Sequence, residues 1–254
     1  MQRETTAATI AIAIDGLTKY YRDVKAVDGL TLSISESEVF GLLGPNGSGK
    51  TTTINCLTGL QKPTKGRIEV GGFDIQTEGE KARGIIGVSP QETAICPYLT
   101  GKENVQLFGA LYSVPKKSLD GRVDYVMEKV GLLDDAGRKV SKYSGGMKRR
   151  VSLAMALVTD PRIILLDEPT VGMDPQSRRA VWDFILELRD KGKTIVLTTH
   201  YMEEAEELCD RVGIIDHGRL IALGPPSELK AKYAARNLED VFIQLTGRGI
   251  REGE

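Results

Sequence analysis

A glycine-rich stretch of the chain has the residue types and the spacing of a phosphate-binding loop. The segment GLLGPNGSGKTTT contains the pattern G-x-x-x-x-G-K-[ST], which ends at Lys50 and Thr51. Glycines let such a loop wrap closely around phosphates, with backbone N–H groups pointing inward. We expect Lys50 to meet the β- and γ-phosphates and the Thr51 hydroxyl to bind Mg²⁺. The expected loop residues are Gly44, Pro45, Asn46, Gly47, Ser48, Gly49, Lys50, Thr51 and Thr52.

Two adjacent carboxylates follow an apolar run that predicts a buried strand. In RIILLDEP these are Asp167 and Glu168. Ligand sites of parallel sheets lie at the carboxyl ends of strands, and two such acids are costly there without a cation or a shared proton. We therefore expect Asp167 to hold Mg²⁺ through its water, and Glu168 to polarise a water that attacks the γ-phosphate.

Two further polar side chains also follow predicted strands. His200 ends TIVLTTH and could donate to a phosphate oxygen and orient the water, although a lone histidine is commonly structural. Gln91, in VSPQE, could reach Mg²⁺ or the attacking water. The other histidine, His217, lies in a turn-like segment and stays unassigned. The sequence has no N-K-x-D element typical of guanine binding, so ATP is the expected nucleotide.

A second candidate anion site lies in KVSKYSGGMKRRVSLAMALV. Ser144, Gly145 and Gly146 begin a predicted helix, whose first N–H groups are unpaired and accessible beside glycine. The alternative is that Ser144 is only an ordinary N-cap. We expect the basic run 148–150 of the same helix to form a solvated face, since exposed Lys and Arg are the norm.

The elements around these motifs predict an α/β fold. Alternating apolar residues predict strands near 10–14 and 30–34, and short apolar runs predict buried strands at 39–44 and 163–167. After about residue 160 strands alternate with helices, which implies a mainly parallel sheet covered by helices.

A helical block interrupts this core. Thr100 and Glu103 form a capping-box pattern, and a later run of valines at helical spacing stops at Gly131. We expect an insertion at about 92–158 within a domain at 10–225. A flexible tail at 1–9 and a C-terminal helical extension with a tail at 226–254 complete the expected organisation.

The composition excludes several classes of protein. The chain has 254 residues, with 34 basic and 35 acidic side chains, so it lacks the basic footprint of a nucleic-acid binder. Its three cysteines have no CxxC spacing, which disfavours a disulfide framework or a zinc site and fits a reducing cytoplasm. No apolar run approaches the roughly 18 residues of a membrane helix, so we expect the chain by itself to be soluble.

Taken together, the motifs resemble one family closely, the nucleotide-binding subunits of ATP-binding-cassette (ABC) transporters. The resemblance covers about Ile10 to Leu223. It implies a P-loop NTPase (RecA-like) core with an N-terminal antiparallel β part and an inserted helical subdomain, and ATP and Mg²⁺ as cofactors. The matching motifs are the Walker A loop (44–52), the Q-loop (Gln91), the signature (143–147), Walker B (163–167), the following Glu168, the D-loop (Gly172, Met173, Asp174) and the switch histidine (His200).

The resemblance also implies how ATP is held. In the family an aromatic residue before Walker A stacks on adenine, and Tyr21 matches that position, with Tyr20 as the alternative. Two ATPase domains pair head to tail, and each ATP lies between the Walker A loop of one and the signature of the other. The signature residues that would contact the neighbour's nucleotide are Ser144, Gly145, Gly146 and Met147. Met147 stands where the family usually has glutamine, which puts that side-chain contact in doubt.

The segments YSGGM, TTHYMEEAEELCDR and LEDVFIQLTGR resemble the drug- and lipid-export branch, which includes daunorubicin-resistance ATPases. This implies an ATP-hydrolysing subunit that powers a membrane exporter. Its partners would be a membrane-spanning permease subunit and a second ABC ATPase domain, with no nucleic acid. It would lie peripherally on the cytoplasmic face of the cell membrane, through the membrane partner.

Two other classes stay open. A non-transport ABC ATPase would act with a soluble partner, such as a cluster-assembly or repair factor, although the chain lacks the coiled coils, zinc modules or second cassette of several such relatives. A scaffold without turnover is disfavoured because Glu168 and His200 are both present.

In the family, the insertion after the Q-loop receives a coupling helix of the membrane partner, which points here to the surface near residues 91–111. Ile95, Pro97, Tyr98 and Leu99 either form a docking patch or belong to the core of the insertion.

Overall fold

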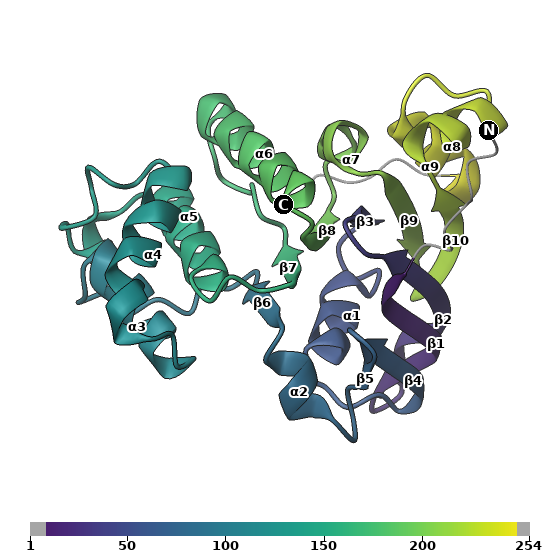
Figure 1. Ribbon diagram of the computed structural model, residues 1–254. Coiled ribbons are helices and arrows are strands. Elements are labelled where there is room, and N and C mark those ends of the chain that lie inside the picture. The colour runs from purple at the N-terminus through teal and green to yellow at the C-terminus, as the bar shows by residue number, and fades with distance from the viewer. Residues whose placement is uncertain (1–8, 248–254) are drawn as a thin grey trace, which may run out of the picture.

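The computed structural model describes residues 9–247, and within this range the chain forms two sheets with helices around them (Figure 1). The larger sheet has six strands in the order β10-β9-β3-β8-β7-β6. These are β3 (Val39–Leu43), β6 (Ile86–Ser89), β7 (Ile163–Asp167), β8 (Thr194–Thr199), β9 (Arg211–Asp216) and β10 (Arg219–Gly224). Neighbours pair in parallel, except β9 with β10. The predicted mainly parallel sheet is confirmed.

The smaller sheet is antiparallel and has the order β2-β1-β4-β5. Its strands are β1 (Ile10–Tyr21), β2 (Val24–Ser35), β4 (Lys65–Val70) and β5 (Phe73–Asp74). This sheet confirms the expected N-terminal antiparallel part. The sequence analysis did not predict β5 or β10, which are short or partly exposed.

Apolar residues on both faces of the larger sheet hold the layers together. In β3, Phe40 and Leu42 belong to the cluster that packs against the smaller sheet and α1. Val39 and Leu43 belong to the cluster on the opposite face. A strand covered on both sides must be apolar along its whole length, which is why VFGLL is a continuous buried run.

Helices cover the larger sheet on both faces. They are α1 (Lys50–Leu57), α2 (Gly79–Arg83), α6 (Pro175–Asp190), α7 (Met202–Leu208), α8 (Pro226–Lys232) and α9 (Leu238–Thr246). Helices α8 and α9 lie where a C-terminal helical extension is expected, and Val241 and Phe242 of α9 are fully buried in the same cluster as strand residues of the core. Helix α2 was not predicted.

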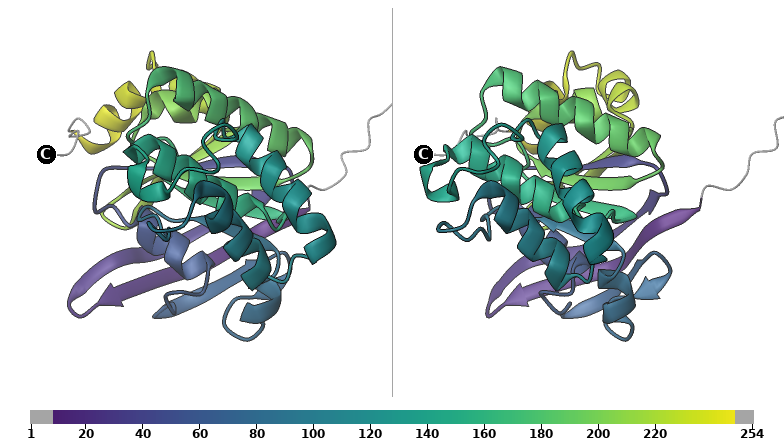
Figure 2. Two further views of the ribbon diagram at one scale, coloured as in Figure 1. Left: turned by 90° about the vertical axis from the view of Figure 1, so that its left-hand side faces the viewer. Right: turned by 60° about the vertical axis from the view of Figure 1, so that its left-hand side comes forward.

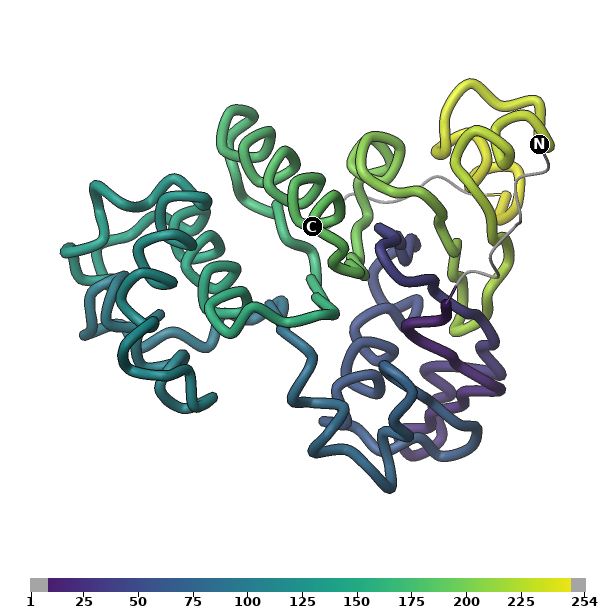
Figure 3. Tube along the Cα trace, in the orientation of Figure 1, coloured from purple at the N-terminus to yellow at the C-terminus, as the bar shows by residue number. Residues whose placement is uncertain are grey.

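A helical insertion separates β6 from β7, and the trace in Figure 3 leaves the core after one strand and returns at the other. It contains α3 (Gly101–Leu111), α4 (Lys116–Lys129), a 3₁₀ turn η1 (Val140–Lys142) and α5 (Gly145–Leu157). The capping box of Thr100 and Glu103 is present at α3. The insertion stands to one side of the core in Figure 1 and comes forward in both views of Figure 2.

The two ends of the chain fall largely outside the described residues. The expected tail at 1–9 lies outside them except for Thr9, and so does the stretch 248–254. Within residues 9–247, no helix combines the length and the apolar character needed to cross a membrane.

Candidate functional site

The glycine-rich loop connects β3 to α1 and passes very close to neighbouring backbone. Gly44 and Gly49 have φ values of 156° and 107°, which lie in the region that side-chain-bearing residues rarely adopt. A Cβ at Gly49 would collide with the carbonyl oxygen of Ala26, and a Cβ at Gly44 with that of Ile215. Only glycine therefore allows the loop to fold into this curve.

The Lys50 side chain turns back into that curve. It is 5% exposed, and Nζ donates to the carbonyl oxygens of Gly44 at 2.7 Å and Pro45 at 3.1 Å. Nζ also lies 3.9 Å from Oε1 of Glu168. Burial lowers the pKa of Lys50, while the negative charges of Glu168 and Asp167 oppose that shift. The loop thus presents a cation at its centre.

A cavity of about 370 Å³ opens beside the loop. Ser48 Oγ is buried with no hydrogen-bond partner among the described residues, and Gly47 borders open space. A buried hydroxyl without a partner, next to glycine N–H groups and a lysine, fits a phosphate ligand. The residues lining the cavity are Tyr21, Ala26, Asn46, Gly47, Gly49, Lys50, Thr51, Thr52, Gln91 and Glu168.

The two tyrosines proposed for adenine stacking differ in their placement. Tyr21 lines the cavity, and Lys19 Nζ lies 5.1 Å from the centroid of its ring. Tyr20 does not line the cavity and instead lies beneath Lys25, with Nζ 5.5 Å from its ring centroid. The geometry favours Tyr21 over Tyr20 as the aromatic platform.

Asp167 and Glu168 stand at the carboxyl end of β7 and are held from β8. Asp167 is 2% exposed and accepts a short hydrogen bond from Thr198 Oγ1. The same hydroxyl accepts from the Glu168 backbone N–H at 3.1 Å. Sequence reasoning missed Thr198, although it lies two residues before His200, and the parallel pairing of β7 and β8 sets it opposite Asp167.

The side chains of Lys50, His200 and Gln91 converge on the Glu168 carboxylate, and Glu168 is 6% exposed. His200 Nδ1 lies 3.2 Å from Oε1, and Gln91 Nε2 donates to Oε2 at 3.4 Å. The hydrogen bond from His200 lowers the pKa of Glu168, with contributions from the charges of Lys50 and Arg149. Glu168 is therefore an ionised carboxylate at neutral pH, available to accept a proton. Its φ of 53° is unusual for a glutamate and turns the chain sharply after the strand.

The candidate Mg²⁺ ligands are of the right chemical type. Thr51, Gln91 and Asp167 supply a hydroxyl, an amide oxygen and a carboxylate, the hard oxygen ligands that Mg²⁺ prefers. Thr51 is exposed at the start of α1, and Gln91 lines the cavity. Among residues 9–247 no cluster of three or more His, Cys, Asp or Glu side chains could hold a metal ion. The site is thus one where protein would supply only part of the coordination.

The second anion site lies apart from this cavity, in the insertion. Ser144 caps α5, and its Oγ accepts from Met147 N–H at 3.2 Å. Ser144 and Gly145 do not line the P-loop cavity, and Gly145 is exposed. A Cβ at Gly146 would lie 3.2 Å from the Gly172 carbonyl oxygen of the D-loop. The helix end therefore faces outward, with the D-loop alongside it.

Met147 turns toward its own subdomain. Its sulfur accepts from Arg138 Nη2 at 3.2 Å, and the side chain packs against the apolar core of the insertion. At the exposed helix end, Met147 contributes its backbone N–H, which donates to Ser144 Oγ, and not its side chain.

The expectation that residues 148–150 form a solvated face is wrong. Arg149 is 6% exposed, and its Nη1 donates to the carbonyl oxygens of Pro90 and of Gln91, the latter at 2.8 Å. Arg150 Nη1 donates to the carbonyl oxygens of Val130 and Gly131, the two residues that follow α4, at 2.9 Å each. The helix is packed on several sides, so its arginines satisfy backbone acceptors instead of water.

Arg149 is thus a direct link between the signature helix and the Q-loop, and sequence reasoning missed it. Burial lowers its pKa, and Nε and Nη2 have no hydrogen-bond partner among the described residues. Nearby, Ser89 of β6 and Ser152 of α5 share a hydrogen bond of 3.2 Å. A Cβ at Gly87 would collide with the Ala156 carbonyl, so strand and helix are in close contact.

A buried glutamate that sequence reasoning also missed joins three segments of the chain. Glu204 of α7 is 1% exposed, and its Oε1 accepts from Thr170 Oγ1 at 2.8 Å and from Trp182 Nε1 at 3.0 Å. Burial raises its pKa. Thr170 lies two residues after Glu168, so Glu204 ties α6 and α7 to the loop that carries Glu168.

The segment after the Q-loop divides between the two alternatives left open by the sequence. Ile95 packs against the apolar cluster that the insertion shares with the larger sheet, and Leu99 is half-buried. Pro97 is exposed, and Tyr98 is 83% exposed. A cavity of about 740 Å³ lies between insertion and core, lined by Leu60, Arg83, Val88, Ala94, Phe108, Tyr112, Met155 and neighbouring residues.

Comparisons with known proteins agree with this arrangement. The family described as "ABC transporter" matches residues 27–171, more than half of the chain. The chain is 43% identical over 241 residues to the daunorubicin resistance ATP-binding protein DrrA3 of Streptomyces coeruleorubidus, covering 95% of this chain and 76% of that protein. It is 43% identical over 238 residues to the linearmycin resistance ATP-binding protein LnrL of Bacillus subtilis (strain 168), covering 94% and 75%.

Solved structures give the same result. The structure of an ATP binding subunit of an ABC transporter superposes with a TM-score of 0.85 at 26% identity, covering 93% of this chain and 99% of that one. A dimeric post-hydrolysis state of the ATP-binding cassette MJ0796 bound to ADP and Pi superposes with a TM-score of 0.79 at 28% identity, covering 84% and 98%.

Proposed function

The chain belongs to the ABC transporter family, and on this premise we propose that it binds and hydrolyses ATP to power a membrane exporter. The observation that carries the proposal is the convergence of Lys50, Gln91 and His200 on the Glu168 carboxylate, beside the phosphate-binding loop. The similarity to resistance ATP-binding proteins supports export, and a drug or lipid of amphipathic character is the cargo we propose.

ATP would occupy the cavity beside the P-loop. The loop residues 44–52 hold the phosphates through backbone N–H groups, and Lys50 supplies the charge that meets the β- and γ-phosphates. Tyr21 stacks on the adenine from the rim of the cavity, where it is partly exposed.

Glu168 acts as the general base. Its carboxylate is ionised at neutral pH, as that of a glutamate with a pKa at or below the usual value must be, so it can accept a proton from the attacking water. His200 orients the carboxylate through Nδ1, which leaves its other ring nitrogen for a phosphate oxygen. Gln91 holds the second carboxylate oxygen. When bound by Thr51, Gln91 and Asp167, Mg²⁺ would neutralise phosphate charge.

The outward-facing end of α5 is proposed to serve a second ATPase domain. Ser144, Gly145 and Gly146 offer anion-binding groups that no phosphate in their own P-loop can reach, since none of them lines that cavity. The Met147 N–H already donates to Ser144 Oγ and so holds that hydroxyl at the helix end. Head-to-tail pairing with a copy of this chain or a close relative would bring a neighbour's nucleotide to them.

A membrane-spanning permease subunit is the proposed partner for transport, and it would hold the chain at the cytoplasmic face of the cell membrane. The cavity of about 740 Å³ between insertion and core, with the exposed Tyr98 nearby in sequence, supports a docking surface for it. We propose that Pro97 and Tyr98 belong to this surface, while Ile95 belongs to the core of the insertion.

We propose the same division of the chain as the sequence suggests. The ATPase domain spans 10–225 with its insertion at about 92–158, and 226–254 form an extension. The packing of α8 and α9 on the core supports an extension that folds with the domain rather than a separate unit.

Copurification tests the proposal. A tagged Glu168→Gln variant, expressed in its native cell and solubilised gently with ATP, should retain a multi-pass membrane protein, because slowed hydrolysis prolongs the ATP-bound state. A Lys50→Ala variant serves as the matched control that does not hold ATP. Recovery of only soluble partners by a preparation that still binds ATP would exclude the transporter function.

A further inference from the structure

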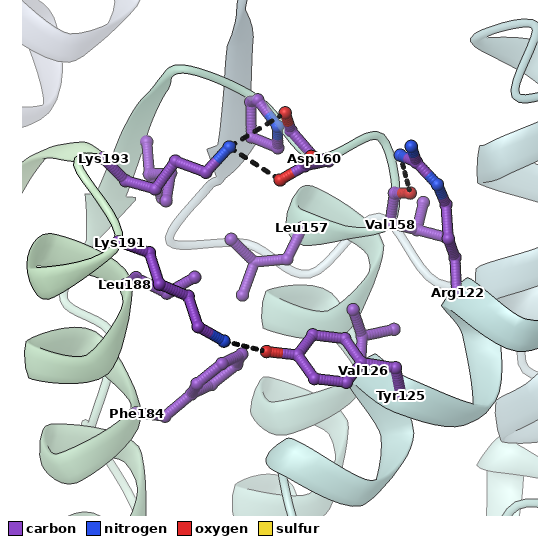
Figure 4. Close-up of a pocket in the computed structure, with 12 residues that line it drawn as sticks. Arg122, Tyr125, Val126, Leu157, Val158, Asp160, Phe184, Leu188, Lys191 and Lys193 are labelled. Atoms are coloured by element: carbon purple, nitrogen blue, oxygen red, sulfur yellow. Dashed lines mark hydrogen bonds and ion pairs between the residues drawn. The ribbon is translucent and has the colours of Figure 1, made fainter.

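A separate cavity of about 310 Å³ lies where the insertion meets the core (Figure 4). It adjoins Ile164 near the amino end of β7, whereas Asp167 and the catalytic cluster stand at the carboxyl end of that strand. The cavity therefore lies on the opposite edge of the sheet from the P-loop. Its lining residues come from α4, α5, α6 and the segments that lead into β7 and β8.

The floor of the cavity is apolar. Leu157 extends into its centre, with Val126 and Phe184 on either side (Figure 4). Leu188 and Ile164 complete the floor, and all five side chains belong to the buried apolar cluster of the larger sheet. The space that they leave corresponds to roughly ten water volumes, which suits the body of a small apolar ligand.

The rim is cationic. Lys193 pairs with Asp160 at 2.6 Å, so these two charges balance. Lys191 and Lys129 share one carboxylate, Glu187, at 2.7 and 2.6 Å, which leaves an excess positive charge beside the cavity. The Lys191 ammonium also donates to the Tyr125 hydroxyl at 2.9 Å.

Arg122 is the rim cation whose hydrogen-bonding capacity is largely unused. Within residues 9–247 its guanidinium makes no ion pair, and its hydrogen bond is a long one, 3.5 Å from Nη1 to the Val158 carbonyl oxygen. A guanidinium carries five N–H donors in a planar fork that matches a carboxylate. Arg122, Lys191 and Lys193 all border the apolar centre at Leu157 (Figure 4).

We propose that this cavity binds an amphipathic carboxylate, a small ring or short chain that carries one anionic group. The apolar part would lie on Leu157 and Phe184, and Arg122 would hold the carboxylate in a bidentate pair. The lining contains no glycine-rich loop, and its one carboxylate, Asp160, is paired with Lys193, so the cavity differs in chemistry from the P-loop site. The occupant would touch both α4 and α6 and so tie the insertion to the core.

A purely structural role for the rim charges would be to cross-link α4 to α6. That role suffices for Lys129 and Lys191, which bridge the two helices through Glu187 and Tyr125. It does not account for Arg122, whose long hydrogen bond goes to the end of α5. Replacing Arg122 therefore separates ligand binding from cross-linking.

Titration of the full-length protein with 4-phenylbutyrate tests the proposal. With methyl-labelled Ile, Leu and Val, the resonances of Leu157, Val126 and Ile164 should shift saturably. Arg122→Gln should weaken this binding about tenfold, the loss expected for a charge-assisted hydrogen bond of modest strength. The matched control Arg236→Gln removes an arginine that is 92% exposed elsewhere on the surface and should bind normally.

Two further measurements test the carboxylate and the cavity separately. The unmodified protein should bind the neutral 4-phenylbutanol about tenfold more weakly than it binds 4-phenylbutyrate. The Arg122→Gln variant should bind 4-phenylbutanol as tightly as the unmodified protein does. Leu157→Phe should fill the cavity and abolish binding while the spectrum stays that of a folded protein. Binding should persist in the presence of saturating ATP, which separates this cavity from the P-loop.

If 4-phenylbutyrate shifts none of the methyl resonances of Leu157, Val126 and Ile164 in a saturable way, the proposal is overturned. Equal affinity of Arg122→Gln for 4-phenylbutyrate would also overturn it, because the carboxylate would then have no specific partner. Shifts that ATP abolishes would assign the probe to the nucleotide site instead.

Discussion

The P-loop and the start of the signature helix use one physical device in two different settings. Each is a helix N-terminus beside glycines, where unpaired N–H groups favour an anion. The P-loop lies among the ends of neighbouring strands, which bring Lys50, Glu168 and His200 together. The α5 end is exposed, with Ser144 as its cap. The first setting can support chemistry, whereas the second offers only binding groups to another molecule.

The two regions are connected within the chain. Arg149, two residues beyond the signature, donates to the carbonyl oxygens of Pro90 and Gln91, and the Gln91 side chain donates to Glu168. A change in the catalytic cluster therefore has a short path of hydrogen bonds to the outward-facing helix. Single substitutions can test the P-loop region, the exposed end of α5 and the hydrogen-bonded connection between them separately.

Glu168→Gln should cause the largest loss of turnover, and it changes the P-loop region alone. The variant loses the proton acceptor, so turnover should fall by about 10² to 10⁴ while ATP still binds. Phosphate release and nucleotide binding, measured on the same preparation, check this. Unchanged turnover would transfer the role of general base away from Glu168.

Ser144→Arg should disable the exposed end of α5 without affecting the P-loop region. A bulky cation at the helix end blocks close approach by a second domain, so ATP-driven pairing should be lost and turnover should fall by about 10². ATP binding by the monomer should be unaffected. Light scattering with and without ATP measures pairing, and normal pairing by this variant would refute the division of roles.

Arg149→Gln should weaken the connection. It loses charge-assisted hydrogen bonds to the Q-loop backbone, so kcat should fall about tenfold with little change in KM for ATP. Arg150→Gln is the matched control, because it removes an equivalent pair of contacts to the end of α4. A loss of turnover of the same size in both variants would mean that general helix packing, not the Q-loop contact, is responsible.

Glu204→Gln should have the smallest effect, seen in stability and its pH dependence. Burial raises the pKa of Glu204 above 4.5, so the folded state binds more protons than the unfolded state between pH 4.5 and the raised pKa. The free energy of unfolding of the unmodified protein should therefore fall through that window as pH rises, by about 1.4 kcal/mol for each pH unit that the window spans.

The variant keeps the acceptor oxygen for Thr170 and Trp182 but cannot ionise. Its stability relative to the unmodified protein should increase with pH above 4.5 and be constant below it. Urea unfolding at several pH values measures this difference, and a difference independent of pH would show that Glu204 is not responsible.

The strand and loop motifs could be predicted because their local sequence already contains the physical constraint. VFGLL must be buried on both faces, and the glycines that follow permit a curve that other residues cannot adopt. Thr100 with Glu103 carries both halves of its capping box within four residues. These predictions needed no knowledge of distant parts of the chain.

Arg149, Thr198 and Glu204 could not be assigned in the same way. Each owes its role to a partner 30 or more residues away, such as the Gln91 carbonyl for Arg149 or the Thr170 hydroxyl for Glu204. Arginines in a helical run are usually solvated, so the sequence alone favoured the wrong environment for residues 148–150. The packing of α5 against β6 reversed that expectation.

The sequence by itself determined the family resemblance, the order of the motifs and the types of groups that would meet phosphate, because residue type and short-range spacing carry that information. Only the tertiary structure decided which groups meet. It brings Gln91 and His200 to Glu168, separates Ser144 from the P-loop cavity and leaves an open cavity beside Arg122. The physical reason is that contacts between strand ends and between subdomains depend on register and packing over the whole chain.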